Sequence, residues 1–460
     1  MIAIYARPSA PRADLGATTH AKASGDMQKK AFTGQFVAAG VLLNVGIAPA
    51  WAADPAGSGS SAANRLPAQV AQAASDQPPP APGEQPAAAE EQPAAPTAMT
   101  TPTMVGPLAA NPNPMSFDAG PLGPVYVTGA VSALGLWQNN KFPGDQHSLA
   151  SLSNGQFMFQ KTEGLFQYFV QAGAYTLPAL GTPYVNTPKA TGDFYGALPQ
   201  AFIKLAPTDT FSIQAGKLPT LIGAEYTFSF ENMNIQRGLL WNQENAVNRG
   251  VQLNYAADPF TFAFSWNDGF YSNRFTWLWG SLAYALDKQN TFSVVAGGNY
   301  AHTTKATLAT PLFQNNETIL NLIYTYNSAP WTITPYFQYT NVPAASSIGA
   351  FTSASTYGGA ILANYSFPEE SPLSGFSLPV RFEYIASTGN AANGAPNLLY
   401  GPGSKAWSVT VTPTYQYKIY FARAEFSHVG TTSTTPGLVF GPGGTNTTQT
   451  RAVLEAGILF

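Results

Sequence analysis

From Pro124 to Phe460, apolar and polar residues alternate with a period of two, and this alternation constrains the fold more than any other feature of the sequence. The segment FTFAFSWN at 260–267 is an example, with an aromatic residue at every second position. Because successive side chains of a β-strand point to opposite faces, such segments predict strands with one apolar face. Pro335 and Pro413 interrupt the pattern locally, since proline has no N–H to donate to a β-ladder.

The alternation predicts about sixteen strands joined by connections that are short and long in turn. The strands are expected at 125–137, 148–161, 165–177, 196–206, 210–217, 246–257, 260–269, 276–287, 291–303, 315–328, 331–342, 355–367, 376–388, 405–416, 419–430 and 449–460. Short turns near residues 162, 207, 257, 287, 328, 368 and 417 alternate with longer connections at 138–147, 178–195, 218–245, 270–275, 304–314, 343–354, 389–404 and 431–448. A soluble β-sandwich or a β-helix does not require this order. An all-β, transmembrane, antiparallel up-and-down β-barrel does, because every second connection faces the same side of the membrane.

The scarcity of charge agrees with a membrane barrel. Only 10% of the residues are charged, whereas soluble globular proteins have roughly 25%. The one long apolar run, at 36–50, is interrupted by Asn44 and is shorter than the ~20 residues of a spanning helix. Cysteine is absent, which excludes disulfides and thiolate metal ligands. The net charge of −3 offers no basic surface for a nucleic acid.

Residues 1–52 are typical of a secretory signal peptide. Two lysines precede the apolar run, and the motif AWA at 50–52 supplies the small residues that a signal peptidase reads. Residues 1–26 do not fit the basic start of such a peptide, so translation is expected to begin at Met27.

Residues 53–123 differ in composition from the alternating region that follows them. They are rich in Ala, Pro and Gln, and such a segment cannot bury enough apolar surface to offset its ordering entropy. We expect a disordered periplasmic segment there, followed by the barrel at 124–460.

The last ten residues, RAVLEAGILF, sort into two rows. Leu454, Ile458 and Phe460 fall on an apolar face, and Arg451 and Glu455 fall on the other. In a closed barrel the last strand pairs with the first, so Phe460 is expected on the lipid-facing side, in the aromatic girdle at the periplasmic rim. The ending resembles the C-terminal membrane-insertion signal of bacterial outer-membrane proteins, which implies the barrel-assembly machinery as a partner during biogenesis. Ile458 departs from the aromatic residue that is usual at its site.

The segment GKLPTLIGAEYTFSFENMNIQRGLL, from Gly216 to Leu240, and the preceding VQAGAYTLPALG resemble the OmpL-like family of outer-membrane β-barrel porins. The likeness extends over most of 124–460. It implies a pore in the outer membrane of a Gram-negative bacterium, and it carries over no catalytic or ligand-binding residue. It also implies a homotrimer, the usual assembly of sixteen-stranded porins, although no interface can be identified in the sequence.

Candidate catalytic and metal-binding residues are few. His147, His302 and His428 have no metal-ligand spacing and are expected to be solvated surface residues. Ser427 and His428 are adjacent in a strand and therefore point to opposite faces, which argues against a Ser–His hydrolase. The glycine-rich segments GPGS and GPGG lack the Lys-Ser or Lys-Thr ending of a phosphate loop. The sequence predicts no enzymatic activity, no cofactor and no metal site.

Six charged residues on the predicted strands lie opposite the apolar positions and are expected to face the lumen. A charge on the lipid face would cost roughly 2–4 kcal/mol near the membrane midplane. Two interpretations remain open: the six charges only neutralise one another in a water-filled interior, or they also shape permeation. They are Arg381, Glu383, Arg423, Glu425, Arg451 and Glu455.

The connection at 218–245 is the longest and is expected to be the third outer loop, folded inward. It carries Glu225, Glu231 and Glu244 with a single base, Arg237. Since the arginines of the last strands lie across a closed barrel from this loop, acids on the loop would face bases on the wall. The resulting transverse field would form the pore constriction. The alternative is a solvated cap outside the barrel.

Together these features predict a general diffusion porin, a barrel surrounded by outer-membrane lipid that passes small hydrophilic solutes and ions through its water-filled interior. A barrel of this size leaves an aqueous channel, whereas about eight strands would leave a filled interior. One alternative is a sugar-selective channel, in which Phe202, Trp277 and Trp279 offer stacking faces inside. Another is a plugged barrel with a structural or adhesive role.

Overall fold

The structure of the chain is a computed structural model that describes residues 104–460. The expected signal peptide at 1–52 lies outside the described residues, as does the Pro- and Ala-rich segment up to residue 103.

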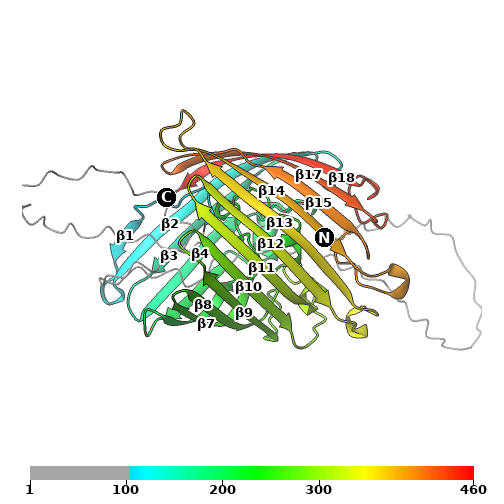
Figure 1. Cartoon of the computed structure of the whole chain (residues 1–460), viewed down its shortest axis with the longest axis horizontal. Coiled ribbons are helices and arrows are strands. Elements are labelled where there is room, and N and C mark those ends of the chain that lie inside the picture. Colours follow the sequence, from blue (N-terminus) through cyan, green and yellow to red (C-terminus); the bar gives the residue numbers. More distant parts are fainter. Residues whose placement is uncertain (1–103) are drawn as a thin grey trace, which may run out of the picture.

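The described residues form one antiparallel sheet that closes on itself (Figure 1). Its last strand, β18, pairs with β2 from Ala130 to Gln138. The strands are β1 (Met115–Asp118), β2 (Pro124–Gln138), β3 (Ser148–Lys161), β4 (Phe166–Tyr175), β5 (Gln200–Leu205), β6 (Phe211–Pro219), β7 (Val247–Ala257), β8 (Phe260–Asn267), β9 (Trp277–Ala285), β10 (Asn290–Asn299), β11 (Thr318–Ser328), β12 (Trp331–Val342), β13 (Ala354–Ser366), β14 (Phe376–Ser387), β15 (Lys405–Val411), β16 (Thr414–Tyr417), β17 (Tyr420–Thr432) and β18 (Thr448–Leu459).

We call each strand position in the closed wall of the barrel a stave, and two of these eighteen strands do not add a stave. The short β1 pairs with the first residues of β2, on the edge that β18 leaves free. β15 and β16 are two parts of one stave, because each pairs with both β14 and β17. Pro413 lies between them, where a missing N–H breaks the ladder. The closed barrel therefore has sixteen staves, as the alternation predicted.

The connections alternate in length around the barrel. Only residues 258–259 join β7 to β8, and only 329–330 join β11 to β12. On the opposite side, residues 176–199 join β4 to β5, and 220–246 join β6 to β7. We call the two rims the short-turn end and the long-loop end. The predicted order of short and long connections is confirmed.

Apolar side chains cover the outside of the barrel, and polar side chains fill the inside. On β8, Phe260, Phe262 and Phe264 are each more than a third exposed, whereas Ser265 and Asn267 are buried. This arrangement reverses that of a water-soluble protein, and it suits a barrel surrounded by lipid. Exposed aromatic residues gather near both rims: Trp137, Trp266, Tyr339, Tyr357 and Trp407 toward the long-loop end, and Phe260, Tyr284, Trp331, Tyr417 and Tyr420 toward the short-turn end.

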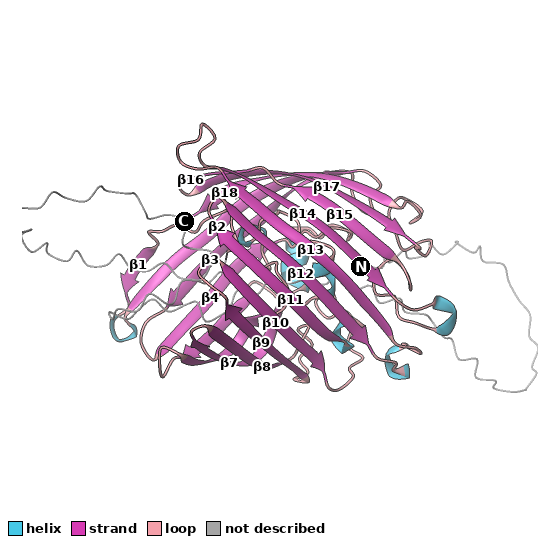
Figure 2. Cartoon of the chain, viewed as in Figure 1, coloured by secondary structure: helices cyan, strands magenta, loops and turns pink. Residues whose placement is uncertain are grey.

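Helices are short and few beside the strands (Figure 2). They are η1 (Gly120–Leu122), α1 (Thr187–Asp193), η2 (Ser229–Glu231), η3 (Leu240–Gln243), η4 (Gln314–Asn316), η5 (Ser346–Ile348) and η6 (Ala391–Asn393). None of the helices within residues 104–460 has the length and apolar character needed to cross a membrane.

Residues 104–123 depart from the prediction of disorder up to residue 123. The strand β1 pairs in register with β2, from Met115 opposite Val127 to Asp118 opposite Pro124. Leu108 is buried, with an exposed fraction of 2%. These residues are ordered because a free sheet edge satisfies their backbone hydrogen bonds and an apolar site accepts the leucine, neither of which composition reveals.

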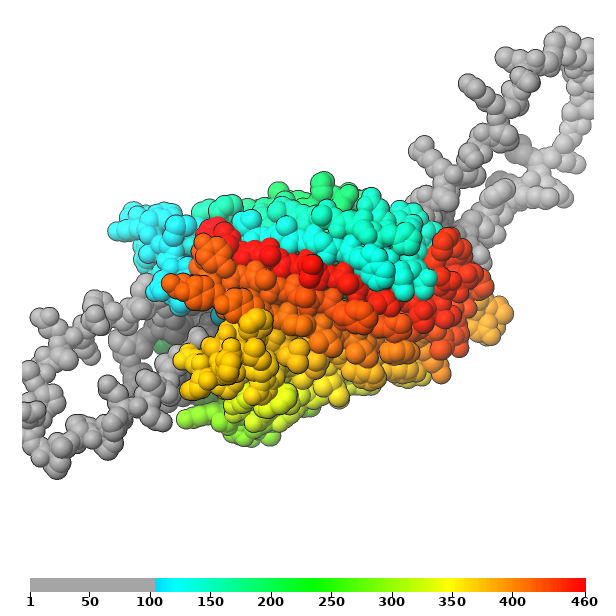
Figure 3. All heavy atoms as spheres, turned by 90° about the horizontal axis from the view of Figure 1, so that it is seen from above, coloured from blue at the N-terminus to red at the C-terminus, as the bar shows by residue number. Residues whose placement is uncertain are grey.

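The seam between the first and last staves runs along the red and cyan strands in Figure 3. Phe460 exchanges two backbone hydrogen bonds with Gly129, of 2.8 and 3.0 Å. Its ring lies over Gly129 and 5.6 Å from the ring of Phe157, which is 47% exposed. Phe460 therefore lies on the outer face, as predicted, and Leu454 in the same row is 66% exposed.

Replacing Gly129 with valine is expected to slow closure of the barrel, because a Cβ at this position would overlap the Phe460 ring. The folded yield over time can be followed by heat-modifiable gel mobility. Gly135→Val is a matched control on the same strand, since a Cβ there meets no atom within 4 Å. Equal folding rates for the two variants would contradict the proposed fit between Gly129 and Phe460.

Candidate functional site

The third long connection is the longest fully buried stretch within residues 104–460. Every residue from 220 to 248 is buried. A solvated cap outside the barrel, the alternative considered for this connection, would leave such residues exposed. The connection, which we call the inner loop (residues 220–246), contacts side chains on the inner face of β14, β17 and β18.

The inner loop is held in shape by its own polar groups. The side chain of Asn232 accepts from the N–H of Tyr226 and donates to the carbonyls of Tyr226 and Phe228. The Glu231 carboxylate accepts from the N–H of Phe228 at 2.8 Å. These bonds replace a regular ladder across the turn around η2.

On β14, Arg381 and Glu383 bind the loop from adjacent inward positions. Arg381 forms an ion pair with Glu225 at 2.5 Å and donates to the carbonyl of Gln236 at 2.8 Å. Glu383 accepts from the backbone N–H of Leu239 at 3.0 Å. Glu383 also lies 3.3 Å from Arg381, so one arginine is shared by two carboxylates.

On β17 and β18, a second group of charges repeats this arrangement. Glu425 accepts from the backbone N–H groups of Ile235 and Gln236. Arg423 donates to the carbonyl of Asn232 at 3.1 Å and pairs with Glu455 on the neighbouring strand. All of these side chains are at most 3% exposed.

Arg451 connects the wall to both long connections. It donates to Gln138 on β2 at 2.9 Å, to the Gln236 side chain at 3.0 Å, and to the carbonyl of Ala179 at 2.8 Å. Ala179 in turn forms a parallel bridge with Arg237. The second long connection is thus joined to the inner loop, an arrangement that the sequence did not predict.

A glycine allows the loop backbone to approach the wall. A Cβ at Gly238 would overlap the carboxylate of Glu383. The N–H of Gly238 donates to Glu225 at 2.7 Å, so the residue lies between the two acids that share Arg381.

The remaining two charges of the inner loop do not pair with the wall bases. Arg237 is fully buried, with its guanidinium 5.2 Å from the Trp241 ring. Its Nε and Nη2 have no hydrogen-bond partner within the described chain. Glu244 accepts from the hydroxyl of Tyr336 on β12 at 3.3 Å. The sequence grouped Glu244 with the acids facing arginines, whereas its hydrogen bond is to a tyrosine.

Burial shifts the titration of the loop acids. It raises the pKa of Glu225 to about 7, although the Arg381 guanidinium opposes the shift. It raises the pKa of Glu231 to about 8, against the Phe228 N–H and Arg237. Burial also lowers the pKa of Arg237 to about 10. The negative charge of the loop therefore develops around neutral pH and above, while Arg237 stays protonated.

The three aromatic residues considered for sugar stacking point inward; other side chains cover Trp277 and Trp279, whereas Phe202 stays partly exposed. Trp277 and Trp279 are at most 1% exposed and belong to a cluster with Leu221, Ile222 and Phe270. Phe202 packs beside Phe169, with ring centroids 5.5 Å apart.

The histidine and serine positions agree with their predicted faces. Ser427 accepts from the Gln236 side chain at 3.3 Å inside the barrel, whereas His428 lies beside the exposed Trp407 outside it. Within residues 104–460, no group of three or more His, Asp or Glu side chains is placed to hold a metal ion.

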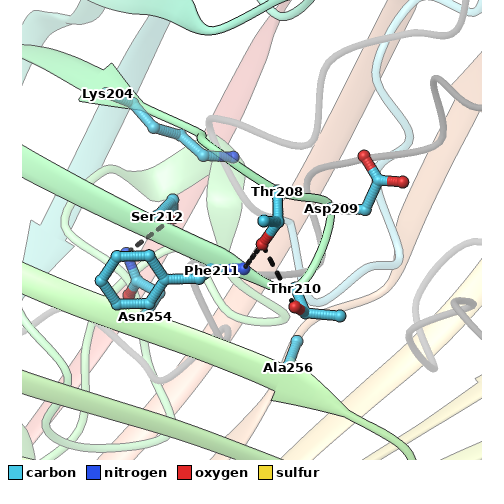
Figure 4. Close-up of a pocket in the computed structure, with 8 residues that line it drawn as sticks. All are labelled: Lys204, Thr208, Asp209, Thr210, Phe211, Ser212, Asn254 and Ala256. Carbon is cyan, nitrogen blue, oxygen red and sulfur yellow. Dashed lines mark hydrogen bonds between the residues drawn. The ribbon is translucent and has the colours of Figure 1, made fainter.

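A small hollow lies at the short turn between β5 and β6, away from these charges (Figure 4). Hydrogen bonds already link its polar groups: Thr208 to Thr210 at 3.2 Å, and Asn254 to Ser212 at 3.3 Å.

Comparisons with known proteins agree with this architecture. Residues 124–460 match a family described as "Putative beta-barrel porin-2, OmpL-like". The outer-membrane expressed OmpT of Vibrio cholerae superimposes with a TM-score of 0.50 at 12% identity, covering 75% of this chain and 100% of OmpT. OmpF of Salmonella typhi, in a complex with daunomycin, gives a TM-score of 0.48 at 13% identity, covering 75% of this chain and 100% of OmpF. OpdK of Pseudomonas aeruginosa, with vanillate, gives a TM-score of 0.44 at 9% identity, covering 73% of this chain and 98% of OpdK. At these identities the likeness concerns the fold alone. No curated protein matches the chain.

Proposed function

The chain belongs to the OmpL-like family of beta-barrel porin-2 proteins, whose barrels lie in the outer membrane, and from this premise we propose that it is a general diffusion porin. In this proposal, small hydrophilic solutes and ions cross passively through the barrel, and the inner loop forms the constriction. The protein acts as a channel, without catalysis and without a cofactor.

The observation that carries the proposal is the contact between the charged inner wall and the inner loop. Arg381, Arg423 and Arg451 all reach loop atoms from inward positions on three strands. Polar side chains such as Gln156 and Gln338 continue the polar interior on strands farther around the barrel. A solute-conducting pore requires such a lining, whereas a purely structural barrel would be stabilised better by an apolar core.

The electric field at the proposed constriction is short-ranged, because the acids and bases are in direct contact. The sequence suggested acids and bases facing one another across open space, but Glu225 lies directly on Arg381. Because Glu225 and Arg381 are at most 1% exposed, this pair holds the loop on the wall and does not act across open water. Because these charges nearly cancel, we expect weak ion selectivity.

The sugar-selective alternative is less well supported. Stacking requires open aromatic faces, and the rings of Trp277 and Trp279 are covered by the cluster around Leu221. A homotrimer in outer-membrane lipid, assembled by the barrel-assembly machinery, completes the proposal by analogy with other sixteen-stranded porins.

Conductance of the full chain in planar lipid bilayers tests this function. A diffusion porin should give a current proportional to salt concentration, without saturable block by oligosaccharides. Saturable block would favour the sugar-selective channel. The absence of conductance from folded protein under every condition would contradict a porin.

The selectivity should depend on the loop acids and on pH. Since burial holds the pKa of Glu225 near about 7 and of Glu231 near about 8, both are largely neutral at low pH and ionised in alkaline solution. We expect cation preference to increase as pH rises from about 6 to about 9. Glu225→Gln with Glu231→Gln should abolish this increase and shift the reversal potential in a salt gradient toward anions.

The exposed acids Glu369 and Glu370 in the β13–β14 turn provide the control. Their double replacement by glutamine changes the net charge equally but leaves the inner loop intact. Identical reversal potentials for the two double variants in alkaline solution would show that the loop acids do not control permeation.

A further inference from the structure

Residues 104–110, which precede the barrel, lie at the short-turn end and partly inside it. We call this segment the strap. It packs against inward-facing side chains and contacts the inner loop. Neither the alternating pattern nor the composition of the sequence indicates such a position.

The outer part of the strap is anchored at one short turn. The side chain of Gln416, on β16, accepts from the N–H of Ala109 at 2.8 Å and donates to its carbonyl at 2.8 Å. A side chain that binds both backbone groups of one residue acts as an added strand partner, and it fixes the strap at the rim.

Leu108 is the apolar anchor next to this clamp. It is 2% exposed and belongs to a buried cluster with Ala130, Phe421 and Leu459. These three residues lie on the inner face of β2, β17 and β18, near the short-turn end. Leu108 thus fills an apolar site on the inner face of the wall, which we call the seat, and is not a contact on the protein surface.

The inner part of the strap reaches the inner loop. The N–H of Val105 donates to the carbonyl of Glu231 at 3.0 Å. Val105 also packs against two separate clusters, one containing Phe228 and the other containing Leu240. Four residues thus lead from the rim at Ala109 to the loop that we propose as the constriction.

We propose that the strap is an autoinhibitory gate, seated in the lumen from the short-turn side and closing the pore against the inner loop. The proposal rests on the porin function argued above. Its attachment is suited to release, because residues 104–110 contain no charged side chain and are held by the Gln416 clamp, one backbone hydrogen bond to Glu231 and the apolar packing of Val105 and Leu108. Withdrawal of the strap opens the lumen without unfolding the barrel.

Two substitutions in the full chain test the gate. Leu108→Asp places a charge in the apolar seat, and Gln416→Ala removes the clamp. Both variants should show a several-fold higher mean conductance or open probability in planar bilayers. Leu122→Asp and Gln289→Ala are matched controls, because both residues are exposed near the short-turn end and neither touches the strap clamp. Control variants should conduct like the unmodified protein.

A labelling experiment tests the buried position of Leu108 without a measurement of current. The chain has no cysteine, so single cysteines can be introduced at Leu108 and at the exposed Ala110. We expect a membrane-impermeant maleimide to react slowly with Leu108→Cys and quickly with Ala110→Cys in the folded protein. Equal reaction rates at the two positions would show that Leu108 is not buried in the barrel and would overturn the proposal.

The gate and the porin function fail in different ways. If folded Leu108→Asp and Gln416→Ala conduct no more than the unmodified protein, which itself conducts, the gate is wrong and the porin stands. If no variant conducts, including one shortened in the inner loop, the porin function is wrong and the gate falls with it.

Discussion

Deletion of residues 226–236 is expected to raise the single-channel conductance several-fold. The deleted segment contains the groups that bind Glu425 and Arg423 on the wall, and all of its residues are buried inside the barrel. Removing it should leave open space next to a charged wall, which water and ions can fill. Conductance in planar bilayers measures the effect directly.

The barrel itself does not depend on this segment for its strand pairing, so the deletion should still fold. Heat-modifiable gel mobility and circular dichroism provide the check. Deletion of residues 390–393, at the exposed tip of the β14–β15 connection, is the control and should leave conductance unchanged. An unchanged conductance in the folded 226–236 deletion would show that the inner loop is not the constriction.

Arg381→Ala is expected to destabilise the folded protein by roughly 3–5 kcal/mol, the usual cost of removing one partner of a buried ion pair. Two carboxylates, Glu225 and Glu383, would be left in a site from which water is excluded. Urea unfolding of the barrel in lipid or detergent, followed by tryptophan fluorescence, measures the loss.

An exposed ion pair shows what the same truncation costs at the surface. Lys189 and Asp193 pair on α1 with side chains 59% and 46% exposed, so Lys189→Ala should cost about 0–1 kcal/mol. In alkaline solution, where Glu225 would be ionised without its partner, combining Arg381→Ala with Glu225→Gln should recover part of the loss, because one unpaired charge is removed. An Arg381→Ala variant as stable as Lys189→Ala would mean that water reaches the site and that the ion pair does not stabilise the contact between loop and wall.

The barrel could be predicted from the sequence because one rule, alternation, acts at every strand. The same rule placed Arg381, Glu383 and Arg423 on the inner face, where the structure has them. Local rules failed where partners are distant in the chain. Nothing near Ala179 indicates that it pairs with Arg237, and nothing near Gln416 indicates that it binds Ala109.

The candidate site was predicted by residue type but not by pairing. Glu225 was expected to face arginines, and it contacts Arg381. Glu244 was expected to behave likewise but binds Tyr336, because burial in the loop is decided by the shape of the surrounding wall. The inward position of Trp277 followed from parity, whereas its covering by Leu221 depends on the path of the inner loop.

The carboxylates of Glu383 and Glu425 bind the inner loop through its main-chain amides at residues 235, 236 and 239. An attachment of this kind does not depend on which side chains the loop carries at those positions. The side chains at 235 and 239 are buried in apolar clusters, so exchanges between apolar residues there change packing while these main-chain hydrogen bonds keep the loop in place. Natural variation, or a protein engineer, could alter the side chains of the loop without redesigning the wall that holds it.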